Sequence, residues 1–451
     1  MYVIAKDGSG DFTSIQAAVD AVSSGYRAPV ILLVRAGEYH ERVIINKDNI
    51  RLIGEDRDNT VITHSGYAME LDENGQEKGT FLSYTMLVTG SNVEVENLTV
   101  RNDAGDGRVV GQAVAVYAAG DRGTWRNCRM IAHQDTLFCG PTMPNVKKDA
   151  EPYWVPDGVL SVGDCPPVHA RQYFEDCYIA GDVDFIFGPY RCWFERCTLF
   201  MNERGGWYTA ANTPEWAFYG FVFHCCRLTG ACAEGEALLG RPWRAFARTI
   251  FLDCEMDEHV SPEGFADWDE ARLVTERCGE NGTWGARADQ SARHPKQKRL
   301  TEAEAELLTI AEVLSGYDQW HPDRRVPTWF LCGSRELEWA GALSVLAGDV
   351  FVQNVTTPGL SGAAQDERLH LMELCLRPGD KVFTDVSDGA ALSIIETACR
   401  QSAAPVLISS AAGQDIAVNT DRAQLIELRD LGLSGQLPMA RAILASLQSL
   451  A

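Results

Sequence analysis

The chain has 451 residues, of which 45% are hydrophobic and 23% are charged, a balance typical of a soluble globular protein with two or three domains. Its net charge of −23 argues against a nucleic-acid partner, because phosphates bind to basic surfaces. No stretch approaches the roughly 18 consecutive apolar residues of a membrane span, so no membrane partner is expected. The 14 cysteines are too dilute for a disulfide scaffold.

The first residues, Met1 to Gly8, indicate a strand followed by a turn. They lack the basic start and apolar core of a secretory signal. We therefore expect a cytoplasmic protein; the alternative is a secreted protein whose signal segment has been removed.

Short strands separated by turns fill the first two thirds of the chain. A short amphipathic helix is predicted at 14–22, and the apolar run at 30–34 predicts a strand that is buried on both faces. Further strands are predicted at 43–45, 50–53, 93–100 and 112–117.

A six-residue pattern, in which an aromatic residue is followed three positions later by cysteine, then occurs five times. Its cysteines are Cys128, Cys177, Cys197, Cys226 and Cys254, at spacings of 49, 20, 29 and 28 residues. A turn of about 20 residues with variable loops predicts a parallel β-solenoid over residues 1–290. We interpret the cysteines as a buried packing ladder. The longest insertion, at about 140–170, is expected to form a wall of the binding groove.

Two aspartates occupy the same position in two copies of this repeat. Asp135 lies seven residues after Cys128, and Asp184 lies seven residues after Cys177. In stacked turns their carboxylates would lie within roughly 5 to 10 Å of each other. Such a pair suits acid, base or nucleophilic chemistry, although aspartate also ends strands in many solenoid turns for purely structural reasons.

Several separate blocks of residues carry a family resemblance. They are Ala5–Phe12, Gly37–Glu41, Thr80–Phe81, Gly111–Ala115, Gln134–Leu137, Gly181–Gly188 and Leu239–Trp243. In content and order they resemble the pectin methylesterase family, over most of residues 1–322. The resemblance implies a right-handed parallel β-helix and the hydrolysis of galacturonate methyl esters.

The resemblance also implies roles for five residues. Asp184 would be the nucleophile, and Asp135 the general acid that later becomes the base. Arg241 would hold Asp184 in its charged form, while Gln112 and Gln134 would donate hydrogen bonds to the developing oxyanion. The expected substrate-binding residues are Thr80, Gln112, Phe187, Arg241 and Trp243. Asp182 and His133 are interpreted as structural.

Residues 291–451 no longer show the strand and turn pattern of the first part of the chain. Residues 291–324 predict a helical tail that packs on the solenoid, with one helix at 302–313. Residues 325–451 predict an α/β domain with a parallel sheet, with strands at 329–332, 350–355, 381–386 and 406–409 and helices at 338–346, 365–376, 390–398, 422–431 and 438–450. This part loosely resembles the IIA domain of mannose-type sugar phosphotransferase systems. The phosphorylated His of that family is replaced here by Ser334 or Arg335, so we expect a non-catalytic docking or dimerisation module.

The predicted function is a carboxylic ester hydrolase that removes methyl esters from oligo- or polygalacturonate and releases methanol, with no cofactor and no metal. Two alternatives remain open. A polysaccharide lyase on the same solenoid would need calcium-binding carboxylates and a basic Lys or Arg. A non-catalytic sugar-binding solenoid would not need the aspartate pair, the two glutamines and Arg241 together.

Overall fold

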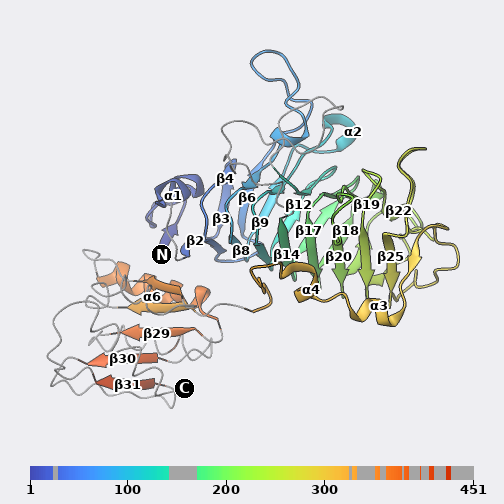
Figure 1. Cartoon of the computed structure of the whole chain (residues 1–451). Coiled ribbons are helices and arrows are strands. Elements are labelled where there is room, and N and C mark those ends of the chain that lie inside the picture. Colours follow the sequence, from blue (N-terminus) through green and yellow to red (C-terminus); the bar gives the residue numbers. More distant parts are fainter. Residues whose placement is uncertain are drawn as a thin grey trace. The chain divides into compact units, whose positions relative to one another are not determined.

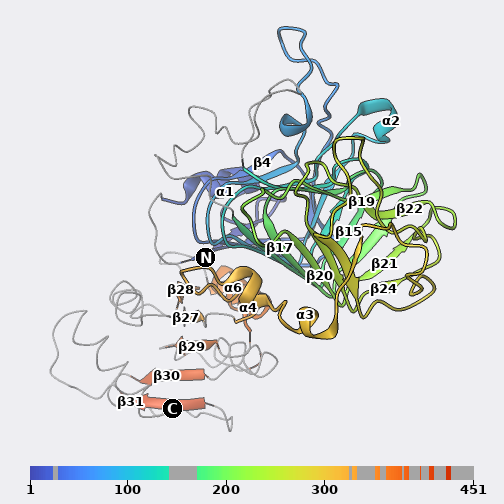
Figure 2. The same ribbon diagram turned by 45° about the vertical axis from the view of Figure 1, so that its right-hand side comes forward.

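A computed structural model describes residues 1–23, 29–141, 170–324, 328–332, 351–355, 362–377, 380–384, 397, 406–410 and 423–427 (Figures 1 and 2). The chain divides into two compact units. One comprises residues 2–25 and 34–323, and the other comprises Met1, 26–33 and 324–451. Within the described ranges, no helix is both long and apolar enough to cross a membrane.

Apart from the five-stranded sheet at 328–427, the parallel strands form a solenoid with three sheets of 11, 8 and 7 strands, and most turns contribute one strand to each sheet (Figure 1). The first sheet runs β1 (Tyr2–Ile4), β2 (Val30–Val34), β5 (Ile50–Gly54), β8 (Glu94–Glu96), β11 (Gly123–Arg126), β14 (Arg171–Glu175), β17 (Arg191–Glu195), β20 (Phe221–His224), β23 (Thr249–Leu252), β25 (Cys278–Asn281), β26 (Lys298–Arg299). The second runs β24 (Glu255–Met256), β21 (Arg227–Gly230), β18 (Thr198–Met201), β15 (Tyr178–Gly181), β12 (Arg129–Ile131), β9 (Thr99–Asn102), β6 (Thr60–His64), β3 (Gly37–His40). The third runs β22 (Ala237–Gly240), β19 (Gly206–Ala211), β16 (Ile186–Gly188), β13 (Leu137–Cys139), β10 (Val116–Ala118), β7 (Met86–Val88), β4 (Val43–Ile45). The predicted parallel β-solenoid is confirmed.

The repeat pattern forms two strands and not one. In the first copy, β11 ends at Arg126 and β12 begins at Arg129, with Asn127 in the left-handed region at φ 48°. The equivalent residues of the other copies are also left-handed: Asp176, Arg196, Cys225 and Asp253. One such residue turns the chain from the first sheet into the second, and Asn and Asp tolerate this conformation well. The strand predicted at 93–100 is divided in the same way, at Asn97.

Stacked side chains fill the interior of the solenoid. The rings of Phe174, Phe194, Phe223 and Phe251 stack with centroid separations of 4.5, 4.4 and 4.7 Å. The five repeat cysteines are free and buried, as expected for a packing ladder. Because every turn presents equivalent side chains to its neighbours, this core fixes the register of the whole solenoid.

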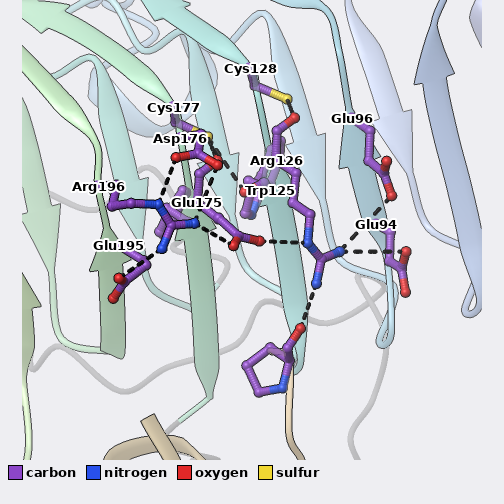
Figure 3. Close-up of polar contacts among 12 residues, drawn as sticks. Glu94, Glu96, Trp125, Arg126, Cys128, Glu175, Asp176, Cys177, Glu195 and Arg196 are labelled. Carbon is purple, nitrogen blue, oxygen red and sulfur yellow. Dashed lines mark hydrogen bonds and ion pairs between the residues drawn. The ribbon is translucent and has the colours of Figure 1, made fainter. Parts of the chain in front are cut away.

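A ladder of alternating charges crosses the end of the first sheet (Figure 3). Arg126 lies 3.0 Å from Glu175, and Arg196 lies 2.7 Å from Glu175 and 2.9 Å from Glu195. Arg126 also donates a hydrogen bond to the carbonyl of Pro322, which connects the ladder to the tail.

The helices of this unit are short. They are α1 (Ile15–Ala21), the 3-10 turn η1 (Thr80–Leu82), α2 (Gly107–Val110), α3 (Glu302–Glu306) and α4 (Ile310–Leu314). Figures 1 and 2 show α2 on one side of the solenoid and the tail helices α3 and α4 on the other. The single helix predicted at 302–313 is two helices, because Thr309 caps a new one by accepting a hydrogen bond from the N–H of Glu312. Val313 and Leu314 of α4 pack on the outer face of the first sheet.

The smaller unit contains a five-stranded parallel sheet and one described helix longer than a turn, α6 (Gly362–Cys375). The strand order is β28 (Phe351–Asn354), β27 (Thr328–Cys332), β29 (Lys381–Thr384), β30 (Val406–Ser410), β31 (Ala423–Glu427). The helix predicted at 422–431 is wrong, because residues 423–427 pair with β30 as an edge strand and this pairing overrides their local propensity. The helices predicted at 338–346 and 438–450, and all of 390–398 except residue 397, lie outside the described residues.

Candidate active site

Both predicted catalytic aspartates lie where the chain passes from the second sheet into the third. Asp135 follows β12 and Asp184 follows β15. The strands after them pair in register, with Leu137 beside Ile186, and the N–H of Asp135 donates to the carbonyl of Val183 at 3.0 Å. The structure thus places the two aspartates at equivalent positions of neighbouring turns.

The backbone at both aspartates is left-handed, with φ 67° at Asp135 and 52° at Asp184. Only 8% of Asp135 and 6% of Asp184 is exposed. A bend at each position presents the carboxylate from a rigid sheet, and aspartate is among the residues that adopt this conformation at modest cost. Local geometry and chemistry therefore favour the same residue at these two corners.

Arg241, which follows β22, binds one of the two carboxylates. Its Nε donates to Oδ1 of Asp184 at 2.9 Å, and its Nη2 donates to Oδ2 at 2.7 Å. The guanidinium lies between two indole rings, 3.8 Å from the centroid of Trp207 and 4.0 Å from that of Trp268. The paired hydrogen bonds and the two rings hold the cation in one orientation. Sequence reasoning did not identify Trp207 or Trp268, since neither belongs to a repeated spacing.

The electrostatic environment distinguishes the two carboxyl groups. Burial raises the pKa of Asp135 well above its usual range, and the nearby charge of Asp184 raises it further. Burial also raises the pKa of Asp184, but the hydrogen bonds and charge of Arg241 oppose that effect. Only Asp184 has a bidentate cation, so the surroundings favour the protonated form more strongly at Asp135 than at Asp184.

The two predicted oxyanion donors lie beside this pair, and both are half-buried. Gln134 directly precedes Asp135, and its carbonyl accepts from the N–H of Ala113 at 3.1 Å. Gln112 is the residue before Ala113, so the two glutamines lie on neighbouring turns. Gly107 permits the close approach of α2, because a Cβ atom at that position would lie 2.8 Å from Cβ of Gln134.

An apolar cluster covers the outer face of the third sheet next to the aspartates. Tyr117, Phe138 and Phe187 are paired in register on consecutive strands. Phe187 lies 4.7 Å from Phe138 and 6.0 Å from Trp243 between ring centroids. Trp243 is half-buried, whereas only 4% of Phe187 is exposed, so Phe187 mainly supports the surface that Trp243 presents.

The predicted contact Thr80 begins η1 and is half-buried. Its neighbour Phe81 packs on the apolar cluster, with its ring 5.0 Å from that of Phe138. The structure therefore places Thr80 at the border of the same surface. Nearly all of the insertion predicted to form a wall of the groove, residues 142–169, lies outside the described residues.

Among the described residues, no group of three or more His, Cys, Asp or Glu side chains could hold a metal ion.

The model of the pectinesterase family matches residues 1–142 and 165–317. The chain belongs to the pectinesterase family. Among its relatives, probable pectinesterase/pectinesterase inhibitor 23 of Arabidopsis thaliana is 30% identical over 72% of this chain and 54% of that protein. Pectinesterase 31 of the same plant is 30% identical over 68% of this chain and 89% of that protein.

Solved pectin methylesterases share the fold. The enzyme from Erwinia chrysanthemi is 27% identical, with a TM-score of 0.58, over 71% of this chain and 97% of that one. The enzyme from carrot has the same identity and TM-score over 70% of this chain and 93% of that one. The predicted family, β-helix fold and pectinesterase class are confirmed.

The expected cytoplasmic location is wrong. The plant pectinesterases to which this chain is related act on the cell wall, outside the cell. The composition and first residues of a sequence do not determine the compartment in which the fold works.

Proposed function

We propose that this chain hydrolyses the methyl esters of methylated galacturonate chains and releases methanol, with Asp184 as nucleophile and Asp135 as acid and base. The observation that carries the proposal is the asymmetry of the buried pair. Asp184 accepts two hydrogen bonds from Arg241, whereas the pKa of Asp135 is raised chiefly by burial and by the charge of Asp184, which the more distant charge of Arg241 only partly opposes. Such a pair supplies a charged nucleophile and a proton donor at the same pH.

In the first step an oxygen of Asp184 attacks the ester carbonyl. Gln112 and Gln134 donate hydrogen bonds to the oxyanion that develops. As the carbonyl re-forms, the bond to the methoxy oxygen breaks, and Asp135 gives its proton to that oxygen. Methanol leaves, and the sugar remains joined to Asp184 as an anhydride.

In the second step Asp135, now a carboxylate, takes a proton from water. The resulting hydroxide attacks the anhydride, which releases the sugar carboxylic acid and restores the carboxylate of Asp184, and the released acid then loses its proton to water. Asp135 ends the cycle protonated. Arg241 stays bound to the side chain of Asp184 and keeps its free oxygen directed toward the substrate.

The substrate class is proposed from the surface around the pair. The half-buried Trp243 and the apolar cluster on the third sheet offer a flat face on which a sugar ring can stack. A related pectin methylesterase has been solved in complex with a hexasaccharide, so a chain of several sugars is a suitable substrate to test.

The test is methanol release from methylated oligogalacturonides of defined length. Asp184→Asn and Asp135→Asn should each lower the rate by about 1000-fold or more, because each removes a group that bonds to the reacting atoms. The matched control is Asp176→Asn, another left-handed aspartate at a solenoid corner, which should keep its activity. Equal methanol release by the wild type and Asp184→Asn would reject the nucleophile.

The same assay separates the alternatives. A lyase would form unsaturated sugar and would lose activity with a calcium chelator, whereas the proposed esterase forms only methanol and acid. A binding solenoid would retain oligogalacturonide and release no methanol.

For residues 325–451 we propose a docking or dimerisation role, without phosphoryl transfer. The support is the parallel α/β sheet, together with the position of Ser334 or Arg335 where the resembling family has its histidine. Light scattering of the full chain tests the dimer, since one chain has a mass of 49.6 kDa. A particle of that mass at all concentrations would reject dimerisation.

A further inference from the structure

A third acidic side chain, that of Asp182, is buried close enough to Asp135 for its charge to act on that residue. The side chain of Asp182 is 1% exposed, and its Oδ2 lies 3.0 Å from Nδ1 of His133. Its Oδ1 accepts a hydrogen bond from the N–H of Val183 at 2.8 Å. The imidazole of His133 is 39% exposed, so solvent reaches the pair from that side.

His133 and Asp182 occupy equivalent positions of the same two turns that carry Asp135 and Asp184. His133 lies two residues before Asp135, and Asp182 lies two residues before Asp184. The N–H of Asp182 donates to the carbonyl of His133 at 3.0 Å, and the N–H of Asp135 donates to that of Val183 at the same distance. A shift of either side chain would therefore move the backbone that carries a catalytic aspartate.

Several other charged groups face this pair. From the turn before, Asp106 and Arg108 approach at α2, where Arg108 is bound to Asp106. From the turn after, Nη1 of Arg204 lies 3.9 Å from Asp182 and 4.0 Å from Asp106. On the catalytic side are Asp135, Asp184 and Arg241.

We propose that His133 and Asp182 act as one positioning element, which holds the two catalytic turns in register and determines whether Asp135 keeps its proton. The proposal rests on the function given above, in which Asp135 is the acid. Neither residue touches the reacting atoms, so both act through Asp135.

The charges of His133 and Asp182 predict the direction in which each residue changes the pKa of Asp135. The negative charge of Asp182 contributes to the raised pKa of Asp135, after burial and Asp184. The hydrogen bond that His133 donates to Asp182 raises the pKa of His133, so the imidazole is charged over a wider pH range than usual. A charged imidazole offsets the negative charge of Asp182. Removal of Asp182 should therefore lower the proton affinity of Asp135, and removal of His133 should raise it.

The experiment compares the pH dependence of kcat/KM for methanol release by the wild type, His133→Gln and Asp182→Asn. Activity falls at alkaline pH as Asp135 loses its proton. Asp182→Asn should move this fall to lower pH, and His133→Gln should move it to higher pH, each by about 0.5 to 1 pH unit. KM should change less than kcat.

The matched control is His224→Gln. His224 is also a half-buried histidine with a carboxylate partner, and its Nδ1 lies 2.8 Å from Glu195 on the first sheet. Its pKa is likewise raised by that hydrogen bond. It is remote from the catalytic turns, so its replacement should leave the pH profile unchanged.

A merely structural pair would lower activity in both variants without opposite shifts, and that result would overturn the proposal. Unchanged profiles in both variants would overturn it as well. If Asp182→Asn fails to fold, His133→Gln, at a half-buried side chain, still tests the alkaline shift. Asp135→Asn tests the proposed function separately, since full activity there would reject the acid itself and not only its support.

Discussion

Arg241 is the residue that makes two similar aspartates chemically different. Burial raises the pKa of both carboxyl groups, so without a cation both would favour the neutral, protonated form more than an exposed aspartate does. The guanidinium forms two hydrogen bonds with Asp184 and packs 3.8 Å from the ring centroid of Trp207 and 4.0 Å from that of Trp268. Arg241 and the two rings around it thus give the two carboxyl groups different surroundings.

Arg241→Lys tests this conclusion. Lysine keeps the positive charge but loses the two hydrogen bonds to Asp184 and the stacking on the indole rings. The pKa of Asp184 should therefore rise, and its carboxyl group should ionise only at higher pH. The acidic limb of kcat/KM should move to higher pH, with kcat lowered by about 10- to 100-fold. Arg227→Lys, at an exposed ion pair on the second sheet, is the control. An unchanged acidic limb would show that Arg241 does not hold the nucleophile in its charged form.

At the scale of single elements, the stacked phenylalanines connect the turns that carry the site. Phe194 lies in the middle of this stack and is fully buried, with rings above and below it. Loss of the Phe194 ring would leave a cavity that the neighbouring strands cannot close, because pairing with the strands on both sides fixes their register.

Phe194→Ala should therefore lower the free energy of unfolding by about 3–5 kcal/mol, measured by denaturant titration. Phe218→Ala, at a side chain that is 72% exposed, should change it little. Similar losses in both variants would mean that the stack is not a major source of stability.

The repeat explains which parts of the molecule could be predicted. The period of the cysteines predicted stacked turns, and stacking alone placed Asp135 beside Asp184. The bends at Asn127 and its equivalents were missed, because a single left-handed residue hardly changes the apolar pattern. Trp207 and Trp268 were missed because they meet around Arg241 through packing between different turns, which no local spacing records.

At the scale of the whole solenoid, the tail ties several turns together through Arg171. This buried guanidinium binds Asp121 at 2.7 Å and Asp318 at 2.6 Å, and it also donates to the carbonyls of Leu314 and Ser315. Arg126 donates to the carbonyl of Pro322 farther along the tail. Arg126, Arg171 and Arg191, which belong to strands of the first sheet, thus all contact the tail.

Asp318→Asn should lower Tm at neutral pH. The hydrogen bonds from Arg171 lower the pKa of Asp318 from 3.8 to about 2. A lowered pKa in the folded state gives stability that is present above pH 3.8 and is lost as the pH falls toward 2. The difference in Tm between the wild type and Asp318→Asn should therefore shrink over that window, whereas Asp323→Asn in the same tail should have little effect at any pH. A difference that does not depend on pH would exclude the charge of Asp318 as its source.

The indole pair around Arg241 has a practical consequence. Indole fluorescence responds to nearby charge and to the exclusion of water, and both rings border the place where a sugar is expected to bind. The chain has 11 tryptophans, so the change in emission caused by Trp207→Phe or Trp268→Phe would identify their share of the signal. Binding of an unlabelled saccharide could then be measured by fluorescence in real time, with no need to detect a reaction product.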